Sequence, residues 1–245
     1  MPPGRVSAGA ASRRRLPPAG ARRVRGGRRV VINADDLGHS GGVNLGVAQA
    51  HDAGVVTSAS LMVNGAAAVH AARLAAARPG LSVGLHFVAP ADTDIDDADR
   101  LAAELARQLA RFRELTGREP SHLDSHHHVH ADGDRMDTFR TAARELGVPI
   151  RHRPGIRYIG GFYGQWEAGV TDLTHLTREY LLELVATEAI GQVSEISCHP
   201  AAHVRGLRSS YGVERLVELE TLTSPGLAAA IADLGVTLVT FDALR

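Results

Sequence analysis

Two adjacent aspartates, Asp35 and Asp36, follow a short β-branched run at residues 30–32. Two ionised carboxylates in a dry pocket repel each other unless a cation lies beside them. Because successive strand residues point in different directions, one carboxylate can bind a metal while the other faces a substrate as a base. A helix N-cap formed by Asp36 or Ser40 is the structural alternative.

Histidines are concentrated in one short segment, which holds five of the 13 in the chain: His122, His126, His127, His128 and His130. Imidazole is a common ligand for zinc and related ions. In an extended segment His126, His128 and His130 share one face, whereas in a helical turn His126 and His130 do. The spacing alone leaves the ligand open. Asp124 is placed to orient a ligand histidine through its second ring nitrogen.

Two further histidines stand at the ends of apolar runs. His86 follows Gly84 and Leu85, and His199 lies between Cys198 and Pro200. Adjacent strand residues face opposite sides, so Cys198 and His199 should not form a nucleophilic dyad. We expect Cys198 to be buried and His199 to face a pocket.

Two histidines and an aspartate can hold a divalent ion while leaving positions open for water and substrate. This donor set fits a hydrolytic metal centre, and it also fits a non-heme iron oxygenase. The oxygenase interpretation requires a fold of two antiparallel sheets. The alternating pattern of this chain does not offer one.

Strand and helix patterns alternate along the chain with short connections, which favours a parallel sheet covered by helices. We predict an α/β fold, a distorted, TIM-like (β/α) barrel of about seven parallel strands, whose carboxyl-terminal rim collects the polar clusters. The expected strands are 30–32, 55–63, 81–87, 121–126, a strand from 148, 193–198 and 236–241; the expected helices are 41–53, 65–77, 98–116, 134–146, 172–190, 211–220 and 225–234, with an irregular loop at 153–170.

The charge is unevenly distributed although the formal total is zero. Nine of the 27 arginines fall in residues 1–29, which hold no acidic residue, so 18 arginines remain against 27 acidic residues. We expect a disordered Arg-rich extension over 1–28 and a single domain over 29–245. Nucleic-acid binding by the extension is disfavoured. A single cysteine excludes a disulfide framework, and no apolar run is long enough to span a membrane.

Taken together, the motifs resemble those of the YdjC-like carbohydrate deacetylase family, which includes chitooligosaccharide deacetylases. The similarity covers roughly residues 30–215, and the order and number of the matching motifs make it specific. The matching segments are Val31-Ile32-Asn33-Ala34-Asp35-Asp36-Leu37-Gly38, the run from Gly54 to Gly65, Gly84-Leu85-His86-Phe87, the run from His122 to His130, Phe162-Tyr163-Gly164 and Cys198-His199-Pro200.

The resemblance implies one divalent metal ion, magnesium or zinc, and removal of the acetyl group from an N-acetylated amino sugar or oligosaccharide with release of acetate. It implies Asp36, His86 and His126 as metal ligands. Asp35 would be the catalytic base, and His199 the acid or oxyanion-stabilising partner. The chain departs from the family pattern at Leu37, which replaces an aromatic residue, in a short segment after His86, and in its Arg-rich extension.

Other functions stay open at this stage. A different metal-dependent amidohydrolase or a phosphoesterase would use the same metal site. A non-catalytic sugar-binding module would not need a paired base and acid, so Asp35 and His199 argue against it. We expect an N-acetylated sugar as the partner, no membrane association and a cytoplasmic location; a homodimer is left open.

Overall fold

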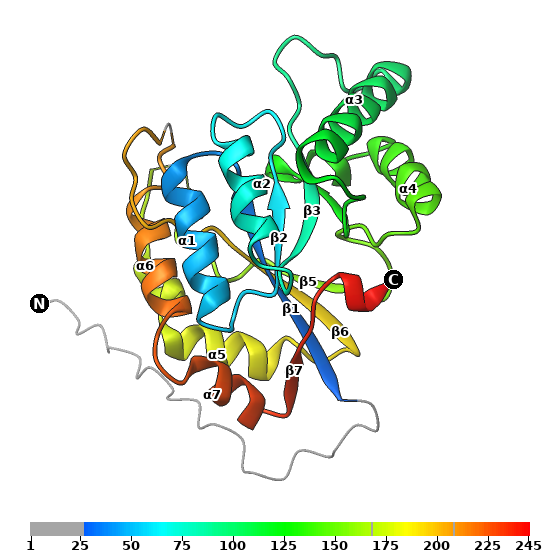
Figure 1. Ribbon diagram of the computed structural model, residues 1–245. Coiled ribbons are helices and arrows are strands. Elements are labelled where there is room, and N and C mark those ends of the chain that lie inside the picture. The colour runs from blue at the N-terminus through cyan, green and yellow to red at the C-terminus, as the bar shows by residue number, and fades with distance from the viewer. Residues whose placement is uncertain (1–26, 168, 208) are drawn as a thin grey trace, which may run out of the picture.

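The computed structural model describes residues 27–167, 169–207 and 209–245. Its centre is a curled sheet of parallel strands (Figure 1). The order is β4-β3-β2-β1-β6-β5, and β7 pairs with the first residues of β1. This confirms the predicted α/β class with a distorted, TIM-like barrel. The strands are β1 (Arg28–Leu37), β2 (Ser58–Leu61), β3 (Ser82–Phe87), β4 (Leu123–Ser125), β5 (Arg157–Ile159), β6 (Val193–Cys198) and β7 (Val236–Leu238).

Seven α-helices of the described chain cover the outside of this sheet and pack against one another, α1 on α2, α2 on α3 and α3 on α4, with α6 beside α1 and α7 beside α5 (Figure 1). They are α1 (Gly41–Asp52), α2 (Ala68–Ala76), α3 (Ala98–Thr116), α4 (Arg135–Leu146), α5 (Arg178–Thr187), α6 (Val213–Leu222) and α7 (Leu227–Asp233). Short 3₁₀ helices lie between or after these elements, at η1 (His126–Ala131), η2 (Leu173–Leu176) and η3 (Asp242–Leu244). None of the described helices is long and apolar enough to cross a membrane.

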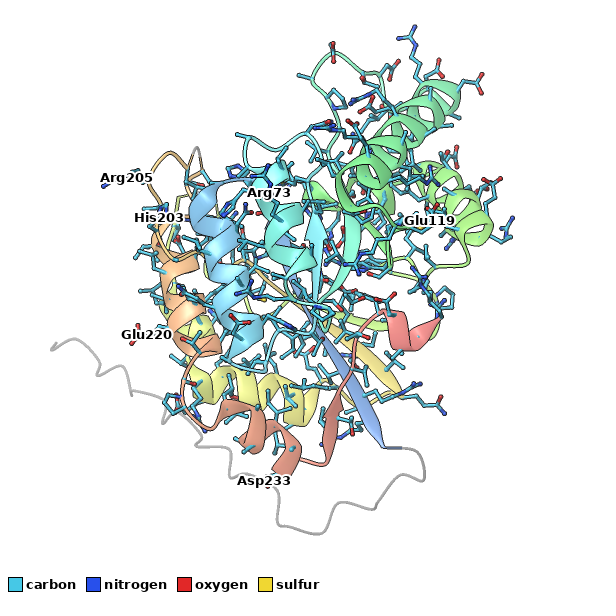
Figure 2. The ribbon with its side chains drawn as sticks, in the orientation of Figure 1. Arg73, Glu119, His203, Arg205, Glu220 and Asp233 are labelled. Carbon is cyan, nitrogen blue, oxygen red and sulfur yellow. The ribbon has the colours of Figure 1, made fainter. Side chains whose placement is uncertain are left out.

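Local signals set the ends of several helices. The Asp97 carboxylate accepts hydrogen bonds from the first backbone N–H groups of α3, and Gly117 ends that helix in a left-handed conformation. Ser40 caps α1 in the same way. The apolar faces of the helices meet the β-branched strands in one large core, while charged side chains such as Arg205, Glu220 and Asp233 stand on the outer surface (Figure 2).

The prediction of a strand from residue 148 was wrong. Only Ile150 forms an isolated parallel bridge with Leu123, and the fifth strand lies at 157–159, inside the segment predicted to be irregular. Pro149 has no N–H to donate to a ladder, and His152 has a left-handed backbone with φ of 64°. The chain therefore turns before it reaches β5. The predicted helix at 172–190 is also divided, because Thr177 caps a new helix, α5, after η2.

Candidate active site

A bulge near the end of β1 positions the acidic pair. The pairing of β1 with β2 shifts between Ala34 and Leu37, so one strand carries an extra residue there. Asp36 adopts a left-handed backbone with φ of 65°, which is uncommon for a residue with a side chain. Both carboxylates are buried at the carboxyl end of the central strand. Such strain persists only where the surrounding contacts enforce it, and it clusters at functional sites.

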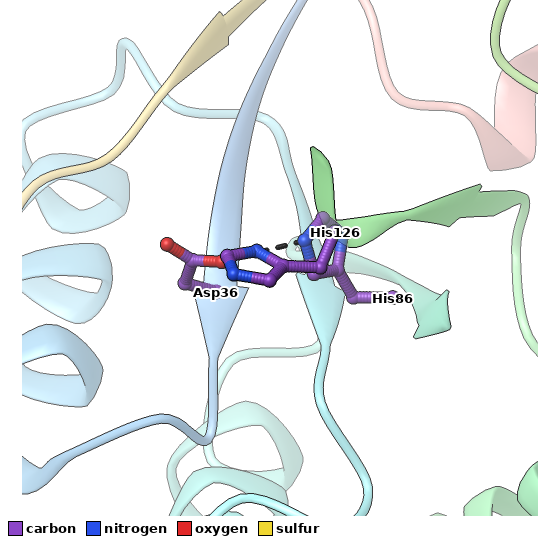
Figure 3. Close-up of side chains that lie close together, drawn as sticks. All are labelled: Asp36, His86 and His126. Carbon is purple, nitrogen blue, oxygen red and sulfur yellow. Dashed lines mark ion pairs between the residues drawn. The ribbon is translucent and has the colours of Figure 1, made fainter. Parts of the chain in front are cut away.

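Three side chains from three different strands converge on one point (Figure 3). Oδ1 of Asp36 lies 3.3 Å from Nε2 of His86 and 3.1 Å from Nδ1 of His126. Asp36 precedes the last residue of β1, His86 lies in β3, and His126 directly follows β4. The other ring nitrogen of His86 contacts Oδ1 of Asp124 at 2.8 Å, the orienting contact expected from the sequence.

The donor atoms of this group fit a divalent cation. Among the described residues, Oδ1 of Asp36 and Nε2 of His86 are buried and have no hydrogen-bond partner. Buried polar atoms are seldom left unpaired, so two that face each other require an explanation. Donor atoms that share one zinc ion, each about 2 Å from the metal, lie about 3 Å apart. The distances from Oδ1 of Asp36 to the His86 and His126 nitrogens match that spacing, and all three donor atoms lie within 4.8 Å of one another.

The surroundings of the group favour positive charge. Burial alone would raise the pKa of Asp36, but His126, His86 and Arg215 hold it well below its usual range. Burial likewise opposes ionisation of His86, yet Asp124, Asp36 and Asp35 raise its pKa to about 10. Arg215 on α6 donates from Nη2 to Oδ2 of Asp36 at 2.6 Å. The second carboxylate oxygen is thus held away from the two histidines.

Asp35 is held by a buried arginine. Both terminal nitrogens of Arg151 donate to its carboxylate at 2.7 Å. The same guanidinium donates from Nε to Glu195 at 2.7 Å and lies 2.9 Å from Asp124. Burial would raise the pKa of Asp35, but the charge and hydrogen bonds of Arg151 hold it below the ordinary value. Asp35 is therefore ionised and fixed in orientation.

His199 faces the cavity while Cys198 is fully buried, as expected from the sequence. Nε2 of His199 lies 4.0 Å from Oδ2 of Asp35, and Nδ1 lies 3.7 Å from Oε1 of Glu218. Burial lowers the pKa of His199, but a hydrogen bond to Glu218 on α6 and the charges of Glu218, Asp35 and Asp36 together outweigh it and leave the pKa raised. The raised pKa favours the protonated form of His199 beside the ionised Asp35.

The structure separates the members of the histidine cluster. His127 and His128 have left-handed backbones, so the segment follows neither of the two regular geometries considered for it. Within the described chain only His126 of the cluster joins Asp36 and His86. His128 contacts the Tyr158 hydroxyl at 3.2 Å, and His130 is buried against Ser125. His122 is buried, and its ring stacks on the ring of Phe241.

Comparison with known proteins identifies the family of the chain. The family model described as "YdjC-like protein" matches residues 29–233. The chain belongs to the YdjC-like family. A chitooligosaccharide deacetylase of Serratia marcescens is 36% identical, with 88% of this chain and 98% of that protein covered. A carbohydrate deacetylase of Geobacillus stearothermophilus is 37% identical, with 86% and 96% covered.

Solved structures share the fold of this YdjC-like protein. A candidate cellobiose-phosphate cleavage protein of Enterococcus faecalis V583 superposes with a TM-score of 0.73 at 24% identity, covering 89% of this chain and 99% of that one. A family 4 carbohydrate esterase from Streptomyces lividans, in complex with acetate, gives a TM-score of 0.55 at 15% identity, covering 87% and 92%. At these identities the likeness describes the fold.

Sequence reasoning missed three charged residues of the YdjC-like site: Arg151, Arg215 and Glu218. All are buried, and each contacts one of the predicted residues. Arg215 and Glu218 lie three positions apart on α6, a spacing that places them on one helix face. A charged helix face normally indicates solvent, and only the tertiary fold turns this one inward. Leu37, the departure from the family pattern, is buried in the main core.

Proposed function

We propose that this protein is a metal-dependent hydrolase that removes the acetyl group from an N-acetylated amino sugar or oligosaccharide and releases acetate. The observation that carries the proposal is the convergence of Asp36, His86 and His126 beside the Asp35–His199 pair in one cavity of about 750 Å³. This volume lies within the range of small-molecule sites. The names of the two curated relatives support the acetylated carbohydrate as substrate.

Asp36, His86 and His126 would hold one divalent ion. When bound, such an ion polarises a carbonyl and lowers the pKa of a coordinated water. Mixed carboxylate and imidazole ligation suits zinc and several related ions, whereas magnesium prefers oxygen ligands. Zinc is therefore the first ion to test, with magnesium as the comparison.

The remaining roles follow from protonation states in the site. Asp35 is ionised and accepts a proton from the water that attacks the acetamide carbon. His199 carries a proton and donates it to the amine nitrogen as the C–N bond breaks. Nε2 of His199 and Oδ2 of Asp35 lie 4.0 Å apart in the cavity that Asp36, His86 and His126 also line. An acetamide placed beside this pair is within reach of both groups, and the products are acetate and the free amine.

Acetate release from N-acetylglucosamine oligomers tests the proposal, with zinc-loaded, magnesium-loaded and chelator-treated protein compared. Asp35→Asn should lower the rate on the order of 10²–10⁴-fold, because the base is lost. Asp94→Asn, at an exposed position that does not line the cavity, is the matched control and should leave the rate unchanged. Chelator-resistant turnover, or a fully active Asp35→Asn variant, would overturn the mechanism.

A substrate panel separates this activity from the two functions left open by the sequence. Turnover of an aryl phosphate without acetate release would identify a phosphoesterase. Saturable sugar binding without any product would identify a non-catalytic module. The cytoplasmic location and a homodimer stay predictions.

A further inference from the structure

Trp166 is the one tryptophan of the whole chain, and its side chain is unusually open to solvent. It is 60% exposed although it is the largest apolar side chain available. Single exposed apolar residues are common and need no explanation in themselves. Trp166, however, lines the cavity that holds the candidate active site. Its position in the wall of that cavity indicates a role in ligand binding.

A row of rings connects Trp166 to the reacting groups. The ring centroids of His199 and Tyr163 lie 5.7 Å apart, and those of Tyr163 and Trp166 lie 5.9 Å apart. Tyr163 is itself fixed by parallel stacking on Tyr211, at 4.6 Å and an angle of 5°. Two ring-to-ring steps therefore lead from the proposed acid to the exposed indole. Trp166 stands farther out along the cavity wall than the reacting centre.

The loop that carries Trp166 is fastened on both sides. Glu214 of α6 is fully buried, and its Oε1 accepts hydrogen bonds from the side chains of Gln165 and Thr171. The backbone N–H of Asp172 also donates to the carbonyl of Gly164 at 2.8 Å. A buried carboxylate thus ties the residue before Trp166 to a residue five positions after it. The indole is thus exposed between two anchored positions of the chain, which reduces the entropy lost when a ligand binds.

The chemistry around the indole is that of a sugar site. A tryptophan ring offers a broad, flat apolar face, which suits the C–H face of a pyranose ring. Polar groups lie along the same cavity wall, where the exposed Ser209 and Ser210 can hydrogen-bond to hydroxyl groups. Such polar groups can fix the orientation of a ligand that stacks on the indole.

We propose that Trp166 is the stacking platform of a second sugar subsite. It would hold the pyranose ring next to the one whose acetamide reaches Asp35. This inference rests on the proposed function and refines it, because it makes an oligosaccharide, and not the monosaccharide, the preferred substrate. Trp166→Ala should raise the KM for an N-acetylglucosamine oligomer about tenfold, equivalent to about 1.4 kcal/mol, and change the KM for the monomer less than twofold.

Because Trp166 is the one tryptophan, the indole fluorescence of the protein reports on this residue alone. Titration of the metal-loaded Asp35→Asn variant with N-acetylglucosamine trimer should give a saturable change in indole emission. The monomer should give little change at concentrations that saturate the reacting subsite. A trimer that binds, as judged by calorimetry, without altering the emission would overturn the proposal.

Two variants complete the test. Val170→Ala alters an exposed residue of the same loop that does not line the cavity, and should leave the KM for the trimer unchanged. Trp166→Phe keeps a smaller aromatic face and should fall between wild type and Trp166→Ala. Equal kinetics for wild type and Trp166→Ala on the trimer, with acetate still released, would sink the subsite and leave the deacetylase proposal standing. Absence of acetate release from every substrate would instead sink the deacetylase proposal.

Discussion

Replacing Arg151 by Met is predicted to be severely destabilising, because the side chain is fully buried among three carboxylates. Nitrogens of Arg151 lie 2.6–2.9 Å from oxygens of Asp35, Asp124 and Glu195. With charge centres about 4 Å apart, each attraction is about 4 kcal/mol at an effective dielectric constant of 20, and the desolvation of the ions offsets most of it. Removing one partner of such a buried group costs about 3–5 kcal/mol, because the remaining charges lose their compensation.

Urea unfolding followed by circular dichroism measures this loss. Arg78→Met is the control, because Arg78 makes the same two-pronged contact with Asp52 at the surface, where the pair should contribute at most about 1 kcal/mol. Without Arg151 the pKa values of the three buried carboxyls rise. A group whose pKa is raised by folding loses its stabilising contribution as pH increases, so the deficit of Arg151→Met should be larger at pH 8 than at pH 5. A deficit below about 1 kcal/mol at both pH values would refute this reasoning.

Three further results are expected. Glu218→Gln removes the charge that keeps the pKa of His199 raised, so the alkaline limb of the kcat profile should move to lower pH; an unmoved limb would contradict the role of His199 as the acid. Gly84→Ala should lower stability by about 1–3 kcal/mol, since a Cβ there would lie 2.4 Å from ring atoms of His122, whereas Gly41→Ala meets open space and should be nearly neutral in thermal denaturation. Burial lowers the pKa of His122 to about 4, so the unfolded chain binds a proton at higher pH than the folded chain does, and the stability falls as pH drops from about 6.5 toward 4. His122→Gln should reduce that fall by on the order of 3 kcal/mol. An unchanged pH dependence of urea unfolding in the variant would disprove this prediction.

Much of the fold could be predicted from local pattern. The apolar runs ending in Asp36, His86 and His199 are strands or strand ends, as expected, because β-branched runs and the polar residues that follow them mark parallel strands. The weak point was the region from 148 to 170. There Pro149 and a left-handed His152 end one extended run early, and β5 forms only because β6 provides its partner.

The sequence by itself determined which residue types were available for chemistry and that they would meet at one rim. That rule depends only on alternation of strand and helix, which brings the carboxyl ends of parallel strands together. The expected extension over residues 1–28 falls almost entirely outside the described residues, so it stays a prediction.

The spacing of the histidine cluster left open which member joins Asp36 and His86; the family resemblance implied His126, and the tertiary structure brings that residue to them. His127 and His128 have left-handed backbones, so neither a helical turn nor an extended segment sets the directions of these rings, and such a turn leaves no periodic signal in the sequence. His126 alone of the cluster joins Asp36 and His86 in the described chain. The sequence also gave no signal that Arg151, Arg215 and Glu218 would be buried. A charged residue is assigned to solvent by default, because burying a charge costs several kcal/mol unless a partner compensates. Those partners lie up to 179 residues away along the chain, so only the folded structure shows that these charged residues are buried.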